Sequence, residues 1–131
     1  MPTVLFVDDE QPLLTAISRV LRGEAFNVVT TTSPSHALRM VATEKIDVVV
    51  SDEGMSEMSG AALLEQVHKR YPEIVGIMLT GGASLSASTH IIGNGHLYRF
   101  LSKPIDNGEL RRVLRQALHL RERLSHRLQA R

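Results

Sequence analysis

The sequence contains no cysteine and no tryptophan, and only 4% of its residues are aromatic. The absence of cysteine excludes disulfides and thiolate metal sites. No apolar run approaches the roughly 18 residues that a membrane-spanning helix requires. The first residues, MPTVLFVDDE, have no basic region ahead of their apolar run, so the pattern of a secretory signal peptide is missing. We therefore expect a soluble, cytoplasmic protein without a membrane partner.

The chain has 131 residues, of which 43% are hydrophobic, and this is enough for the core of one compact domain. Its net charge of +1 is unevenly distributed: residues 1–102 carry 7 Lys and Arg against 11 Asp and Glu, whereas residues 103–131 carry 8 against 3. A basic tail can bind nucleic acid, but no aromatic residue is interleaved with these arginines. We expect a solvated helix face and no direct contact of this domain with nucleic acid.

Short apolar runs alternate with amphipathic segments along the chain. Apolar residues at three- and four-residue spacing predict helices between the runs. The runs themselves are nearly continuous, which indicates strands buried on both faces and therefore a parallel sheet flanked by helices. The predicted fold is a doubly wound α/β domain with a five-stranded parallel sheet in the flavodoxin-like order 2-1-3-4-5. The expected strands are residues 4–7, 27–31, 48–50, 74–79 and 97–101.

Two segments fit this alternation less well. Residues 83–96 have helical spacing but are rich in Ser, Thr, Gly and Asn, so we expect a short or mobile helix there. The last predicted helix continues beyond what one domain needs, and we assign residues 1–120 to the domain and 121–131 to a helical extension or linker. The six histidines are scattered, with no pair at i, i+4 spacing, and we expect surface or packing roles for them.

Polar residues follow the predicted strands where each strand ends. Asp8 and Asp9 follow the first strand, Asp52 the third, Thr80 the fourth and Lys103 the fifth. In a doubly wound sheet these ends meet at one edge, where ligands bind. Crowded carboxylates repel one another, and Mg²⁺, which prefers oxygen ligands, relieves that repulsion. A hydroxyl and an ammonium beside the ion can neutralise a phosphoryl group while one carboxylate acts as nucleophile.

The joint pattern resembles the receiver domain of two-component response regulators over residues 3–120. That family has an acidic pair after strand one and a phosphoacceptor Asp within a D-x-x-M-P-x-M-x-G stretch after strand three. It also has a Ser or Thr after strand four and Lys-Pro after strand five. The residues that carry the resemblance are Asp8-Asp9, Asp52 with Met55, Met58 and Gly60, Thr80 followed by Gly81, and Lys103-Pro104.

The resemblance implies a phosphoacceptor switch rather than an enzyme that turns over a small molecule. Asp52 would accept a phosphoryl group from the phosphohistidine of a sensor histidine kinase or a phosphotransfer protein. Mg²⁺ would be held by Asp9, Asp52 and the backbone carbonyl of Gly54, with Asp8 helping through water. Slow autodephosphorylation would be the only other chemistry of the domain.

The same resemblance implies a moving part beside the site. Lys103 would contact the phosphoryl oxygens, and its peptide bond to Pro104 would be cis. Thr80 would move toward the phosphoryl group, and Phe100 would follow it inward as the switch residue. Tyr98 precedes Phe100 by two positions, so both side chains should point to the same side of the strand, and which of them switches is open. The last two helices and strand five would then control an effector domain or a partner protein, with a homodimer left open.

Three positions depart from the family pattern. The family proline is Ser56, which loosens the loop without changing its chemistry. The positions two after Asp52 and two after Thr80 are Gly54 and Gly82, where family members carry side chains that orient or exclude the hydrolytic water. We hypothesise that dephosphorylation here is unassisted by side chains. An unchanged lifetime of phospho-Asp52 after the changes Gly54→Asn and Gly82→Glu would contradict this idea.

Two other protein classes share parts of the pattern. A phosphohydrolase of the haloacid-dehalogenase type also combines an Asp, a Ser or Thr, a Lys and Mg²⁺, but it has D-x-D where this chain has D-D-E. A flavodoxin-like flavin binder needs a phosphate loop where VDDEQP is acidic. Turnover of a small phosphate ester would favour the first and a coloured protein the second. The stretch LYRFLSKP resembles receivers that precede enzymatic outputs, such as cyclic-di-GMP phosphodiesterases or ATPase-type transcription activators.

Overall fold

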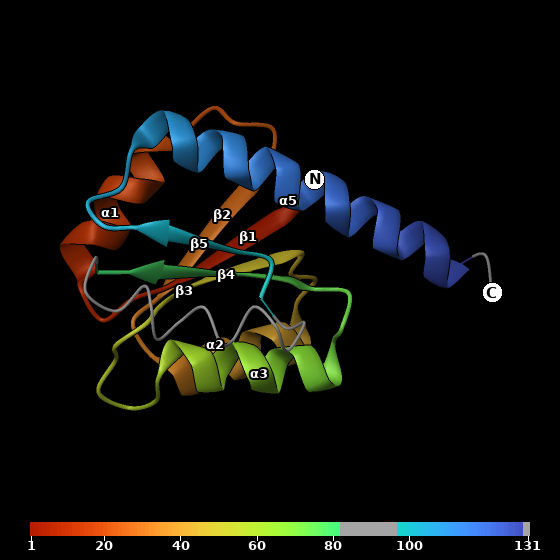
Figure 1. Ribbon diagram of the computed structural model, residues 1–131, viewed down its shortest axis with the longest axis horizontal. Coiled ribbons are helices and arrows are strands. Elements are labelled where there is room, and N and C mark those ends of the chain that lie inside the picture. The colour runs from red at the N-terminus through yellow and green to blue at the C-terminus, as the bar shows by residue number, and fades with distance from the viewer. Residues whose placement is uncertain (82–96, 130–131) are drawn as a thin grey trace.

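A five-stranded parallel sheet forms the centre of the protein (Figure 1). The computed structural model describes residues 1–81 and 97–129, so the helix predicted within 83–96 lies outside the described residues. The strand order is 2-1-3-4-5, which confirms the predicted fold class. The strands are β1 (Thr3–Val7), β2 (Asn27–Thr31), β3 (Val48–Asp52), β4 (Val75–Thr80) and β5 (Arg99–Ser102).

Four described helices flank the sheet: α1 (Gln11–Val20), α2 (Pro34–Thr43), α3 (Gly60–Arg70) and α5 (Asn107–Gln129). Helices α1 and α5 cover one face and α2 and α3 the other, while the last turns of α5 project beyond the sheet (Figure 1). Ser33 caps α2 by accepting a hydrogen bond from the backbone N–H of His36, and Pro34 occupies the first helical position, as predicted. Among the described helices, none combines the length and the apolar character that crossing a membrane would need.

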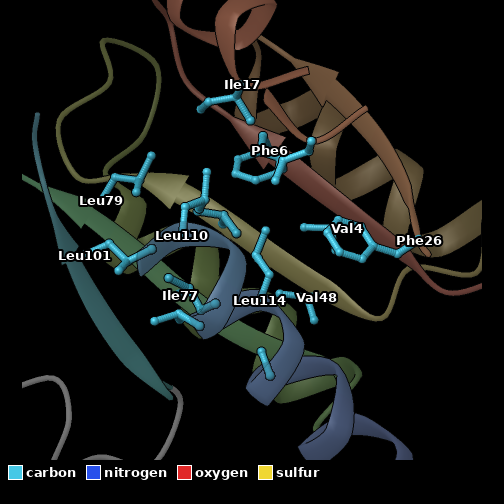
Figure 2. Close-up of a cluster of buried hydrophobic side chains, with 14 of the residues drawn as sticks. Val4, Phe6, Ile17, Phe26, Val48, Ile77, Leu79, Leu101, Leu110 and Leu114 are labelled. Atoms are coloured by element: carbon cyan, nitrogen blue, oxygen red, sulfur yellow. The ribbon is translucent and has the colours of Figure 1, made fainter. Parts of the chain in front are cut away.

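Two hydrophobic clusters fill the space between the sheet and its helices. The first, beneath α1 and α5, includes Val4, Phe6 and Leu114 (Figure 2). The second, beneath α2 and α3, includes Leu5 and Val7. Successive residues of β1 thus enter opposite clusters, which is why the strand is apolar throughout. Burial of each large side chain stabilises the fold by about 1.5–3 kcal/mol relative to exposure.

Tyr98 and Phe100 pack on opposite faces of the sheet, so the prediction that they share one side is wrong. Tyr98 packs against the cluster beneath α1 and α5, whereas Phe100 packs against the cluster beneath α2 and α3. The prediction assumed strict two-residue alternation, which holds only inside a strand, and β5 begins at Arg99. A switch through Phe100 would therefore act on the α2 and α3 face.

Several basic residues of α5 contact the body of the domain. Arg112, Arg115 and Arg123 are exposed, as expected of a solvated face, whereas Arg111 and Arg121 are partly buried. Arg111 donates a hydrogen bond from Nη2 to the backbone carbonyl of Val20 at 3.0 Å. Arg115 places Nη2 3.0 Å from Glu24 Oε1, and Glu24 is shared with Arg111 at 3.7 Å. These contacts attach the first half of α5 to the end of α1.

Arg121, which the sequence places in an extension beyond the domain, contacts Asp47 just before β3. Its Nε lies 3.5 Å from Asp47 Oδ1, and the two side chains are only 12% and 8% exposed. The other carboxylate oxygen of Asp47 accepts the backbone N–H of Thr3 at 2.9 Å. Leu120 and Leu124 pack against the cluster beneath α1 and α5. A cavity of about 730 Å³ opens beside this pair, at the amino-terminal edge of the sheet.

Replacing Arg121 by Gln should lower the free energy of unfolding by about 1–2 kcal/mol, because Asp47 would keep a buried charge without its ionic partner. The matched control is Arg123→Gln, since Arg123 is an exposed arginine of the same helix. Its effect should stay below about 0.5 kcal/mol. Urea unfolding followed by circular dichroism measures both changes, and equal stabilities of the two variants would contradict the assigned role of Arg121.

Candidate functional site

Three carboxylates converge at the carboxyl edge of the sheet. Asp8 and Asp9 directly follow β1, Asp52 is the last residue of β3, and one oxygen of each lies within 4.8 Å of the others. The register of β1 and β3, with Val7 opposite Ser51, brings Asp8 beside Asp52. Asp8 is 1% and Asp52 8% exposed, whereas Asp9 faces the solvent. The acids that follow two separate strands thus form one cluster.

The ammonium of Lys103 compensates part of this negative charge. Its Nζ lies 3.0 Å from Asp8 Oδ2 and 3.0 Å from Asp52 Oδ1. Glu10, which the sequence analysis did not single out, places Oε1 3.7 Å from the same ammonium. The carboxylates outnumber the one cation among the described residues of this cluster, so a net negative charge is left at the edge of the sheet.

Thr80 ends β4 next to Lys103. The backbone N–H of Lys103 donates to the Thr80 carbonyl at 2.7 Å, and the Lys103–Pro104 peptide bond is cis. The Thr80 side chain is fully buried, and its hydroxyl has no hydrogen-bond partner among the described residues. Buried hydroxyls are normally paired, so a Thr80 hydroxyl with no partner in the described part of the chain can bond a group that enters the site.

Burial and charge shift two pKa values in the cluster. Burial raises the pKa of Asp52 above its ordinary value, the hydrogen bond from Lys103 opposes that rise, and the charge of Asp8 adds to it. Burial alone would lower the pKa of Lys103, but hydrogen bonds to Asp8 and Asp52 outweigh it and the pKa is raised. Lys103 therefore stays charged at neutral pH, while the ionised form of Asp52 is incompletely compensated.

The loop that follows Asp52 folds back against the end of β3. The backbone N–H of Glu53 donates to the Leu79 carbonyl at 3.0 Å, and the N–H of Gly60 donates to the Glu53 carbonyl at 2.8 Å. Gly60 lies directly against Asp52, since a Cβ at this position would overlap the Asp52 carbonyl oxygen. Gly54, by contrast, has open space where a Cβ would stand. Both ends of the loop are therefore fixed close to the acids.

Glu57, at the middle of this loop, was missed by the sequence analysis. Its Oε1 accepts the backbone N–H of Ser35 at 2.7 Å, and its Oε2 accepts the hydroxyl of Ser33 at 3.3 Å. A signal was present, because α2 has no acidic residue in its own first turn and a helix N-terminus favours a carboxylate. Gly82, the other glycine named in the departures from the pattern, lies outside the described residues.

The donor set fits a magnesium ion. Mg²⁺ is usually bound through one or two carboxylates together with water, and three carboxylate groups lie within 4.8 Å of one another here. Burial, and to a smaller extent the charges of Asp8 and Asp9, raise the pKa of Asp52, and a bound divalent cation would stabilise its ionised form. Sulfur and imidazole ligands would favour a transition metal, and among the described residues the cluster contains neither.

Acids after β1 and β3, a hydroxyl after β4 and a lysine after β5, on a sheet of order 2-1-3-4-5, define an α/β domain of the receiver type. A family model for the response regulator receiver domain matches residues 4–115, so this chain belongs to that family. Of the three interpretations of the sequence, the receiver domain is therefore the one confirmed.

Curated relatives support the same assignment. The transcriptional regulatory protein GlrR of Escherichia coli is 35% identical over 115 residues, which are 88% of this chain and 26% of GlrR. A putative NtrX-like response regulator of Rickettsia bellii is 32% identical over 116 residues, 87% of this chain and 24% of that protein. The chain thus spans about a quarter of the length of these relatives.

Solved structures share the fold over nearly the whole chain. The signal receiver domain of an HD domain-containing protein from Pseudomonas fluorescens has a TM-score of 0.89 at 32% identity, over 96% of this chain and 93% of that one. A response regulator receiver domain protein from Clostridium thermocellum has a TM-score of 0.87 at 28% identity, over 95% of this chain and 99% of that one.

Proposed function

We propose that this domain is a phosphoacceptor switch in which Asp52 receives a phosphoryl group from a sensor histidine kinase or a phosphotransfer protein. The observation that carries the proposal is the meeting of three carboxylates within 4.8 Å with an ammonium 3.0 Å from two of them. Family membership supports the same chemistry. We place the domain among cytoplasmic signalling proteins without turnover of a small substrate.

Mg²⁺ would be held by Asp9, Asp52 and the backbone carbonyl of Gly54, with Asp8 helping through water. Bound there, the ion would supply positive charge to the oxygens of a phosphoryl group. The exposed Asp9 and the open space around Gly54 leave the outer side of the site accessible to a donor. Asp8, which is 1% exposed, also accepts the backbone N–H of Glu10 at 2.9 Å, and this hydrogen bond holds its carboxylate in place.

Phosphoryl transfer begins when an Asp52 oxygen attacks the phosphorus of the phosphohistidine. The new P–O bond forms an acyl phosphate, the P–N bond breaks, and the electron pair leaves on the imidazole nitrogen of the donor. Lys103 lies within 3.0 Å of Asp52 and can turn from the carboxylate to the incoming phosphoryl oxygens. The hydroxyl of Thr80, which has no partner within residues 1–81 and 97–129, supplies a second hydrogen-bond donor.

The switch follows from the added charge, which is about −1.5 to −2 at neutral pH. Thr80 and Lys103 are drawn toward that charge, and Phe100 moves inward on the α2 and α3 face behind Thr80. The surface of β5 and the last two helices then changes for an output. That output is an effector domain in the same polypeptide or a separate partner, and relatives named as transcriptional regulators favour the first arrangement.

The direct test is to incubate the protein with acetyl phosphate and MgCl₂ and to measure its intact mass. We expect a gain of one phosphoryl group that hydroxylamine removes, because acyl phosphates are cleaved by this nucleophile. Omitting Mg²⁺ should prevent the gain. No mass change under any of these conditions, in a folded sample that binds Mg²⁺, would contradict the proposed function.

A further inference from the structure

The loop between β3 and α3, residues 53–59, is attached to the protein at several separate points. The backbone N–H of its first residue, Glu53, donates a hydrogen bond to the Leu79 carbonyl of β4. The backbone N–H of Gly60, which directly follows the loop, donates to the Glu53 carbonyl. Met55 and Met58 are partly buried against the cluster beneath α2 and α3. Between these anchors lie Ser56 and Glu57, where the family pattern has a proline at the first position. The loop therefore lacks its usual rigid residue at the middle.

Glu57 supplies an attachment at that same point. Its two carboxylate oxygens accept hydrogen bonds from the backbone N–H of Ser35 at 2.7 Å and from the hydroxyl of Ser33 at 3.3 Å. Ser33 in turn accepts the backbone N–H of His36 at 3.2 Å, and His36 Nδ1 lies 2.9 Å from the Thr31 hydroxyl at the end of β2. These hydrogen bonds connect the loop to the first turn of α2 and to the end of β2.

The electrostatics favour the ionised form of Glu57 in this place. Hydrogen bonds from the Ser35 side chain and backbone lower the pKa of the Glu57 carboxyl. The partial positive charge at the N-terminus of α2 acts in the same direction, because α2 has no acidic residue of its own in the first turn. The bond between loop and helix is therefore a charge-assisted one at neutral pH.

We propose that Glu57 is a positioning residue, which holds the loop 53–59 against the start of α2 so that the Gly54 carbonyl faces the acidic cluster. This inference rests on the proposed function, in which that carbonyl is a ligand of Mg²⁺. Gly54 has open space around it and stands three residues from Glu57, so its orientation depends on the attachment of the loop. Glu57 replaces the stiffness that a proline at position 56 would give.

The test measures Mg²⁺ binding to the full unphosphorylated chain by isothermal titration calorimetry. Glu57→Ala should weaken Mg²⁺ binding about three- to tenfold. This is less than the roughly 10–100-fold loss that is typical when a residue hydrogen-bonded directly to a metal-coordinating group is removed. Glu57→Gln, which can still accept a hydrogen bond, should retain most of the affinity. Glu44→Ala is the matched control. Glu44 is an exposed acid at the other end of α2, so its replacement removes the same charge without touching the loop.

The double variant Ser56→Pro, Glu57→Ala separates loop position from charge. Proline stiffens the loop without restoring the carboxylate, so the double variant should regain at least half of the lost affinity on a logarithmic scale. Thermal unfolding of every variant confirms that each is folded. Wild-type affinity in Glu57→Ala, an equal loss in Glu44→Ala, or no recovery in the double variant would each overturn the positioning role alone. A wild-type protein that binds no Mg²⁺ would overturn the proposed function as well.

Discussion

Replacing Asp52 by Asn should abolish phosphorylation by acetyl phosphate while the fold survives. The amide cannot act as the nucleophile, and no other described carboxylate combines the burial of Asp52 with a contact of 3.0 Å to Lys103 except Asp8. Asp8 is held by two hydrogen bonds, one from the Glu10 backbone and one from Lys103. Intact mass after incubation with acetyl phosphate and MgCl₂ measures the effect, which we expect to exceed about 100-fold in initial rate, as for loss of other nucleophiles.

Asp8→Asn serves as the comparison, because it removes a neighbouring buried carboxylate without removing the nucleophile. We expect that variant to be phosphorylated more slowly than wild type but at a measurable rate. Stable incorporation of a phosphoryl group into Asp52→Asn at the wild-type rate would refute the assignment of the phosphoacceptor.

Asp52→Asn should also stabilise the metal-free fold at neutral pH. The pKa of Asp52 is raised in the folded state, mainly by burial, so its ionised form costs free energy there. As the pH falls through the raised pKa of folded Asp52 toward the ordinary value of 3.8, the carboxyl becomes protonated in the folded state and the wild type loses this cost. The advantage of Asp52→Asn in thermal midpoint should therefore be largest near pH 7 and shrink in acid.

Gly60→Ala should lower the free energy of unfolding by about 2–3 kcal/mol, at the upper end of what overpacking costs. The added methyl would overlap the carbonyl oxygen of Asp52 and approach the Glu53 Cα at 3.1 Å, and both neighbours are backbone atoms that cannot rotate away. Relief requires that the end of β3 or the start of α3 moves. The phosphoacceptor would then shift relative to Lys103, so phosphorylation should slow as well.

Gly108→Ala is the matched control for this change, since Gly108 also lies in the first turn of a helix. A Cβ there would meet only Asp106 Oδ2 at 3.5 Å, an ordinary contact. Alanine is the better helix former, so this variant should be as stable as wild type or more stable by up to about 1 kcal/mol. Urea denaturation measures both variants, and an equal effect of the two would show that the contact with Asp52 is unimportant.

The strands and the edge where they end could be predicted because both follow from short-range pattern. The run Val48 to Val50 is apolar on both faces, which only a central strand of a parallel sheet explains. Once alternation with helices indicates a parallel sheet, the residue after each strand is placed at one edge. The meeting of Asp8, Asp52 and Lys103 within 3.0 Å contacts is the result of that rule applied to three strands.

The contacts that could not be predicted from the sequence join distant residues, and neither the helical nor the strand periodicity relates the two partners. Arg121 and Asp47 meet because α5 crosses the start of β3, and helical spacing alone says nothing of that crossing angle. Glu57 reaches Ser35 because the loop after β3 meets the first turn of α2, and although that turn has no acid of its own, the sequence does not show which distant acid supplies the missing charge. Tyr98 lies on the other face from Phe100 because it stands just before β5, which begins at Arg99, and the two-residue alternation holds only inside the strand.

The ion pair between Lys103 and Asp8 joins residues 95 positions apart in the chain. During synthesis, the acids after β1 and β3 emerge long before the lysine that compensates them. A nascent or prematurely terminated polypeptide therefore presents bare carboxylates with no ammonium to receive the oxygens of an incoming group. Under the proposed function, a polypeptide that ends before β5 could not relay a signal, because it would lack the lysine that contacts both Asp8 and Asp52.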